Sequence, residues 1–285
     1  MDLYLAAIIQ GLCYSCLGFG VYISLRIFKI PDITTDGSFT IGGAATAVCL
    51  LAGINPYLTL VVALICGAMA GVATAWITTR IRINPLLAGI LVMTSLYSIN
   101  LVIMGRSNLT IDTSSGILSS SFDETTQTTL ISFLATVLIM TCIWWMLRTD
   151  KGIAMRATGS NEKMAAANGI NIDRMKILGL ALANGLTAIS GYLLVQYQGF
   201  ADINMGVGIV ISGLAAVMIG EACTGFFASK SILIVLISIV FGCIVFRLAI
   251  AQSLMMGLNP NYLKLVTAVI VLAFIGLSNL KNKSE

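Results

Sequence analysis

Stretches of about 20 apolar residues recur along the whole 285-residue chain, and they restrict its fold more than any other feature. In the apolar interior of a bilayer, only helices and closed barrels satisfy their own backbone hydrogen bonds, and runs of this length are typical of helices. Charged residues make up 10% of the chain and its mean hydropathy is +0.98, whereas a soluble domain carries about 25% charged residues. The sequence therefore predicts an all-α polytopic membrane protein, with one transmembrane domain over residues 1–285.

Nine apolar runs predict about nine membrane-spanning helices. They cover residues 3–25, 39–53, 57–79, 86–104, 128–147, 175–198, 207–220, 232–250 and 263–277. The second and the seventh runs contain only about 15 residues, too few to cross a hydrocarbon core of about 30 Å comfortably. We expect these two, which follow the first and sixth spans, to be short, broken helices. No basic segment precedes the first run, so we expect a retained helix rather than a cleaved signal peptide.

The distribution of positive charge predicts the orientation of these helices. If the polar segment at residues 148–176 faces the cytoplasm, 13 of the 16 Lys and Arg residues lie on the cytoplasmic side. The opposite orientation would place those 13 outside, contrary to the excess of Lys and Arg in cytoplasmic loops. We therefore expect an external N-terminus, a cytoplasmic C-terminus and an external loop at residues 106–127.

The two short runs occupy corresponding places in the two halves of the chain, which predicts an internal repeat. Gly42-Gly43-Ala44-Ala45 in the first resembles Ser212-Gly213-Leu214-Ala215 in the second. Because five spans separate them, the copies (residues 1–147 and 175–285, joined by 148–174) would be inverted in the membrane. Inverted repeats with short helices at matching places indicate the solute path of a transporter. The alternative is that any two Gly- and Ala-rich membrane helices resemble each other.

The segment before the first short run permits two compatible interpretations. Asp36 or Ser38 could cap the free N–H groups of the short helix. Alternatively, Asp36 could line a solute path, with Gly37 allowing an unwound backbone to approach a ligand. The candidate path residues in the two short runs are Asp36, Gly37, Ser38, Phe39, Gly43, Ser212 and Gly213.

Reactive side chains are rare in the apolar runs, which argues against an enzyme. The chain has no histidine, and its seven cysteines show neither a paired metal-ligand spacing nor a disulfide framework, so no metal site is predicted. Ionisable residues in or beside the runs are few, notably Asp36, Glu221 and Arg247. Ion-coupled carriers usually place carboxylates deep in the bundle. We therefore expect the energy for any transport to come from elsewhere.

The polar, basic segment at residues 148–176 is predicted to contain a surface helix. Residues 161–167 have high helix propensity, with Ser160 or Asn161 as the N-cap and Asn168-Gly169 as the C-cap. Such a helix could insert into a groove of a partner protein, or it could rest on lipid headgroups that attract its cations. These residues alone favour neither alternative.

Several segments resemble one family, the permease subunits of branched-chain amino acid and sugar ABC importers. The similarity lies in Gly152…Arg156-Ala157…Gly159-Ser160-Asn161…Ala165-Ala166…Gly169-Ile170-Asn171…Lys176 and in Ala183…Gly185-Leu186…Ile189-Ser190-Gly191. Two further segments, from Phe28 to Phe39 and from Asn84 to Gly105, are similar to the branch of tryptophan- and tyrosine-type permeases.

The resemblance implies that the loop at residues 150–171 is a coupling helix that docks on a cytoplasmic ATPase dimer. The coupling residues implied are Arg156, Gly159, Ser160, Asn161, Ala165, Ala166, Gly169, Ile170 and Asn171. It also implies an extracytoplasmic binding lipoprotein, a second and identical permease chain, a bacterial cytoplasmic membrane location and a small solute such as an aromatic amino acid. The chain lacks a Gly-x-x-x-x-Gly-Lys-Ser/Thr sequence, so ATP and Mg²⁺ are expected on the partner ATPase. A stand-alone secondary transporter with the same inverted repeats is the alternative.

Overall fold

The computed structural model describes residues 3–111, 124–224, 231–257, 262, 265–269 and 271–272. Within these residues the fold is almost entirely helical, with two three-residue strands. The elements are α1 (Leu3–Val21), η1 (Tyr22–Ile27), α2 (Thr34–Leu51), α3 (Pro56–Trp76), η2 (Ile77–Ile81), α4 (Pro85–Met104), β1 (Asn108–Thr110), α5 (Glu124–Arg148), α6 (Asp150–Ser160), α7 (Glu162–Ala167), α8 (Ile172–Gln198), β2 (Phe200–Asp202), α9 (Ile209–Thr224) and α10 (Ile232–Met255).

Six of the described helices are long and apolar enough to cross a membrane, which confirms the prediction of an all-α polytopic membrane protein. They are α1 extended by η1, α3 extended by η2, α4, most of α5, α8 and α10. The two predicted short helices are α2, with 18 residues, and α9, with 16. The count of nine spans and the orientation stay predictions, and most of the ninth run lies outside the described residues.

Proline and asparagine determine where α3 and α4 begin. Pro56 and Pro85 occupy the first turns, where the missing N–H costs nothing. The side-chain oxygens of Asn55 and Asn84 each accept a hydrogen bond from a free backbone N–H of the first turn, at 2.9 Å. These local signals explain why the predicted and observed starts of the two helices differ by only one residue.

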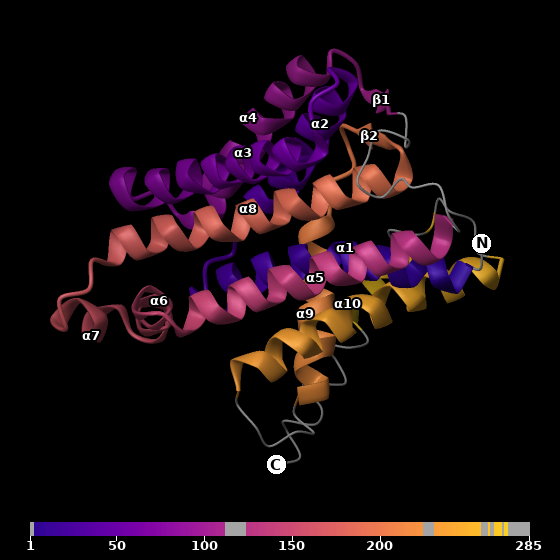
Figure 1. Cartoon of the computed structure of the whole chain (residues 1–285). Coiled ribbons are helices and arrows are strands. Elements are labelled where there is room, and N and C mark those ends of the chain that lie inside the picture. Colours follow the sequence, from indigo (N-terminus) through magenta and orange to yellow (C-terminus); the bar gives the residue numbers. More distant parts are fainter. Residues whose placement is uncertain are drawn as a thin grey trace.

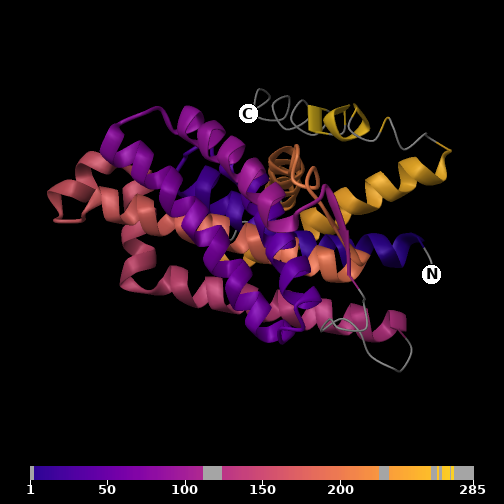
Figure 2. The same cartoon turned by 90° about the horizontal axis from the view of Figure 1, so that it is seen from above.

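Helices α1 and α8 form the centre of the bundle, as Figures 1 and 2 show. In an apolar 18-residue stretch of each of these two helices, 78% of the residues are buried. The corresponding share is 22–33% in α3, α4, α5 and α10. Helix α8 packs mainly against α2 and α3, whereas α1 packs against α9 and α10, so each central helix contacts the short helix of the other half. Small residues allow these close contacts: a Cβ on Gly71 of α3 would overlap the carbonyl oxygen of Leu180 in α8.

Strands β1 and β2 join the ends of α4 and α8 on one side of the bundle. They pair antiparallel, with Asn108 opposite Asp202 and Thr110 opposite Phe200. Helices α6 and α7 lie at the opposite end of α8 (Figure 1). The bundle therefore has two different ends, one formed by the strands and the other by the polar segment.

Candidate functional site

A buried carboxylate, Asp32, determines where α2 begins. Its Oδ1 accepts a hydrogen bond from the backbone N–H of Thr34 at 2.9 Å, and its Oδ2 accepts one from Nδ2 of Asn184 at 2.7 Å. Burial raises the pKa of this carboxyl, and the hydrogen bonds from Thr34 and Asn184 oppose that rise. Helix α2 thus begins at Thr34, five residues before the predicted start at Phe39.

Asp36 lies in the first turn of α2, and its carboxylate caps a different helix. Oδ2 accepts a hydrogen bond from the N–H of Gly208 at 2.9 Å, and Oδ1 accepts one from Val210 at 3.0 Å. These N–H groups belong to the beginning of α9, where a negative charge is favourable. The prediction that Asp36 caps its own helix is therefore wrong: its carboxylate bonds α9, and the N–H of Thr34 at the start of α2 bonds Asp32 instead.

The two short helices consequently meet at their N-terminal ends. A Cβ at Gly206, just before α9, would overlap the backbone oxygen of Asp36, so only glycine permits this approach. Val207 lines cavities on both sides of the junction. We call the contact between residues 32–40 and 206–213, together with Asn184, the α2–α9 junction.

Three of the other predicted path residues contribute to packing. Ser38 donates a hydrogen bond from Oγ to Oδ1 of Asn184 at 2.6 Å, which excludes the predicted capping role. Phe39 is fully buried and stacks on Tyr14, with 5.7 Å between ring centroids. Gly43 lies against Met205 and Val195. Asp32 and Asn184 were absent from the predicted site, although both lie in segments that carry the family resemblance.

A small cavity opens on the α4 side of the junction, with about 20 Å³ of free volume. Asp36 and Gly37, two of the predicted path residues, line it, and their role in a solute path stays a prediction. The other lining residues are Thr40, Met93, Tyr97, Asn100, Ile203, Gly206 and Val207.

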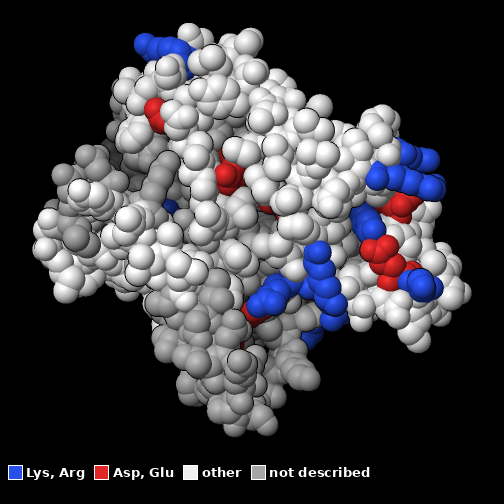
Figure 3. Space-filling view, turned by 180° about the vertical axis from the view of Figure 1, so that it is seen from behind, with Lys and Arg blue, Asp and Glu red and all other residues white. Residues whose placement is uncertain are grey.

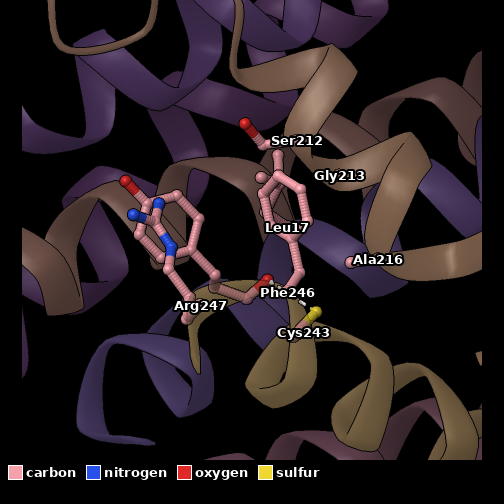
Figure 4. Close-up of a pocket in the computed structure, with 8 residues that line it drawn as sticks. Leu17, Ser212, Gly213, Ala216, Cys243, Phe246 and Arg247 are labelled. Carbon is pink, nitrogen blue, oxygen red and sulfur yellow. Dashed lines mark hydrogen bonds between the residues drawn. The ribbon is translucent and has the colours of Figure 1, made fainter. Parts of the chain in front are cut away.

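Ser212 and Gly213 line the other side of the junction, beside Arg247 of α10 (Figure 4). The guanidinium carbon of Arg247 lies 3.5 Å from the ring centroid of Tyr14, a cation–π contact. A larger cavity of about 260 Å³ borders Arg247 and Ser212 together with Ile211 and Gly208. Within the described residues, no carboxylate lies within 4.0 Å of this arginine in the apolar helix α10.

Helix α7 has the caps that the sequence predicted. Oδ1 of Asn161 accepts a hydrogen bond from the N–H of Met164 at 3.1 Å, and Gly169 follows the helix with φ at +80°. Asn171 in turn caps α8 through the N–H of Arg174, at 3.0 Å. The sequence did not predict α6, whose N-cap is Thr149.

Helix α6 connects this polar segment to α1. A Cβ at Gly159 would overlap the carbonyl oxygen of Ile27, at the end of η1. An ion pair between Nζ of Lys176 and Oε1 of Glu162, at 2.8 Å, joins α8 to α7. We call residues 150–171 the polar arm.

The polar arm presents most of the predicted coupling residues to the solvent. Arg156, Ser160, Asn161, Ala166, Gly169 and Asn171 are exposed, Gly159 and Ile170 are half-buried, and Ala165 is buried. Figure 3 shows charged side chains gathered at the end of the molecule where the arm lies, while much of the same face is uncharged. Arg26, Lys29 and Arg156 line a basic cavity of about 310 Å³ beside Gly159 and Ser160, and Arg26 pairs with Glu221.

Known proteins are similar in sequence to this chain over most of its length. Residues 3–275 match the family described as branched-chain amino acid transport system / permease component. The tyrosine transport system permease protein of Clostridioides difficile is 35% identical over 95% of this chain and 90% of its own. The ribose import permease protein RbsC of Escherichia coli K12 is 23% identical over 88% of this chain and 77% of its own.

A solved structure shares the fold. PsaBC from Streptococcus pneumoniae, in complex with Fab, matches with a TM-score of 0.53 and 16% identity, over 96% of this chain and 89% of that chain. The family match covers nearly the whole sequence and includes both the junction and the polar arm. The chain therefore belongs to the permease family of branched-chain amino acid transport systems and is a multi-pass protein of the bacterial cytoplasmic membrane.

Proposed function

We propose that this chain is the permease subunit of an ATP-driven ABC importer for an amino acid or a related small molecule, with aromatic amino acids as the first candidates. Residues 1–147 and 175–285 are two inverted repeats, and residues 148–174 form a cytoplasmic coupling loop between them. An extracytoplasmic binding protein delivers the solute to a pair of identical permease chains. ATP and Mg²⁺ bind to the partner ATPase dimer, and this chain is not catalytic.

The polar arm is the observation that carries this proposal. Its helix α7 has an exposed surface, with Met164 66% exposed and open space around the Cα of Gly169. Local caps fix its shape, while the Gly159–Ile27 contact and the Lys176–Glu162 pair join it to both central helices. A preordered surface connected to α1 and α8 can transmit a movement of a docked partner to the bundle.

The α2–α9 junction supports the proposed solute path. Two short helices from the two halves meet at their N-terminal ends, and cavities border the meeting point on both sides. Unusually short helices at corresponding places of the two halves indicate where a transporter binds its solute. A stand-alone secondary transporter would share this junction, but it would give the exposed polar arm no function.

The experiment compares Ala166→Arg and Gly169→Trp with the wild-type chain, each co-expressed with its ATPase and binding protein. We expect both variants to lose co-purification with the ATPase and to uncouple uptake from ATP hydrolysis. Gly169→Trp also strains the turn after α7, because Gly169 has φ at +80°, so Ala166→Arg, which brings no such strain, separates lost docking from a distorted turn. Ile81→Arg, at the exposed end of η2 (53% exposed), is the matched control and should retain both properties. Normal ATP-driven uptake by both arm variants would refute the docking site. Ion-driven uptake by the chain alone would favour the secondary transporter.

A further inference from the structure

Asn100, in α4, has a buried side-chain amide that forms no hydrogen bond with the described part of the chain. Its side chain is 0% exposed, and neither its nitrogen nor its oxygen has a hydrogen-bond partner among the described residues. Asn184, equally buried, bonds Asp32, Ser38 and the carbonyl oxygen of Leu180. A buried amide without partners is costly, and such groups are rare in folded proteins. Asn100 therefore requires a partner that the described chain does not supply.

The cavity beside the junction shows what that partner would meet. Asn100, Asp36 and Thr40 line it together, from α4 and α2. The Asp36 carboxylate accepts backbone N–H groups of Gly208 and Val210, to which Ile209 adds a third, and it retains at least one of its about four lone-pair sites. The Thr40 hydroxyl donates to the backbone oxygen of Asp36 at 3.1 Å, so its oxygen remains free to accept. These three residues thus offer acceptors from each of them and one donor group that is not already bonded, the amide N–H₂ of Asn100.

The charge of the cavity favours a cation over a neutral ligand. No Lys or Arg lies within 4.0 Å of Asp36 among the described residues, and the α9 N-terminus contributes only a partial positive charge. The free volume, about 20 Å³, is enough to hold one group of the size of a water molecule or an ammonium. Met93 and the half-exposed Tyr97 provide apolar surface beside it.

We propose that this cavity binds the ammonium group of an α-amino acid, and that Asn100 contacts both that group and the adjacent carboxylate. The oxygens of Asp36, Thr40 and Asn100 accept the three ammonium N–H bonds. The amide N–H₂ of Asn100 donates to a carboxylate oxygen. This proposal rests on the proposed transport of amino acids, and it identifies the ammonium group and the adjacent carboxylate as the part of the solute that the permease recognises.

The lack of protein partners makes Asn100 testable separately from protein stability. Asn100→Leu removes the amide without breaking any hydrogen bond within the described chain, so thermal stability should be retained or increased. The matched control is Ser98→Leu, at an exposed position of the same helix. If Asn100 only held the fold together, the Asn100→Leu protein would lose stability and amino-acid binding in parallel.

Binding of tritiated L-tyrosine and L-leucine to the purified permease in lipid nanodiscs tests the proposal without ATP. We expect a Kd roughly 10- to 100-fold higher in Asn100→Leu, because a hydrogen bond to a charged group is lost, and no change in Ser98→Leu. Tyramine, which keeps the ammonium, should compete with tyrosine. The acid 3-(4-hydroxyphenyl)propionate, which lacks the ammonium, should not.

Equal binding by Asn100→Leu and the wild-type chain would overturn the proposal. Absence of amino-acid binding at millimolar concentration, displacement by D-ribose, or a loss of stability that parallels the loss of binding would overturn it too. ATP-driven uptake by the complete assembly is measured separately. If the wild-type assembly takes up no solute when ATP is added, the proposed importer function is wrong. The proposed ammonium site would still be supported if the wild-type chain binds amino acids and Asn100→Leu does not.

Discussion

The α2–α9 junction and the polar arm are held together by different kinds of contact. In the junction, Asp36 bonds α9 and Asn184 bonds Asp32, so the partners lie 172 and 152 residues apart in the chain. In the arm, Asn161 and Asn171 each cap a backbone N–H three residues away. The junction depends on the whole bundle being assembled, whereas the arm folds on local signals. Substitutions in the junction should therefore affect stability, and substitutions on the arm surface should affect function alone.

The largest effect is expected from Asn184→Leu, in the junction. This change removes a hydrogen-bond partner of the buried Asp32 and the acceptor for Ser38. Asp32 keeps its bond from Thr34, but its Oδ2 and the Ser38 hydroxyl each lose a buried hydrogen bond, at a cost of about 1–3 kcal/mol apiece. Thermal unfolding in detergent should show a large fall in Tm, with Ser98→Leu as the control. An unchanged Tm would show that the network does not hold the junction together.

Asp36→Ala should have the next largest effect. It leaves the N–H groups of Gly208 and Val210 without their acceptor and removes the cap of α9, at a cost of about 1–3 kcal/mol. Asp36→Asn keeps one accepting oxygen and should cost less. The free energy of unfolding should therefore be highest in the wild type, lower in Asp36→Asn and lowest in Asp36→Ala. If both variants were as stable as the wild type, the assigned cap of α9 would be wrong.

Asn161→Ala tests the arm, where we expect a local change. Loss of an N-cap costs about 1 kcal/mol, so α7 should fray while the bundle keeps its stability. Hydrogen exchange should accelerate at residues 162–167, with no change in α2 or α9. A fall in global Tm like that of Asn184→Leu would remove the distinction between the two regions.

Breaking the Lys176–Glu162 pair should have the smallest effect. The Glu162 side chain is 55% exposed, and exposed ion pairs contribute about 0–1 kcal/mol. Glu162→Gln should therefore leave Tm nearly unchanged, and the small difference should disappear at high salt. A loss of more than about 2 kcal/mol would mean that this pair fixes the arm to α8.

The same distinction explains which features the sequence could predict. The surface helix at residues 161–167, with Ser160 or Asn161 as its predicted cap, depends on neighbours in the sequence, and the structure confirms it as α7 with Asn161 as the N-cap. The starts of α3 and α4 also depend on local signals and lie one residue before the predicted ones. The fold class followed from the apolar runs. The start of α2 and the partner of Asp36 depend on residues that only folding brings together, and both were predicted wrongly.

Asn100 was missed for a related reason. An asparagine in an apolar helix gives no sign in the sequence of whether its amide has a partner, and only the packed structure shows that it has none among the described residues. Asp32 could have been found, because an aspartate two residues before Thr34 is a known way to start a helix or turn. The basic cavity around Arg26 and Arg156 also joins residues that are distant in the sequence.

Hydrogen exchange of the permease with and without its ATPase subunits tests most directly whether the polar arm is the docking surface. The backbone amides of residues 161–171 should become protected when the ATPase binds, because their exposed surface is covered. Those of β1 and β2, at the opposite end of the bundle, should not change. Unchanged exchange at residues 161–171 in a complex that hydrolyses ATP would contradict the assignment.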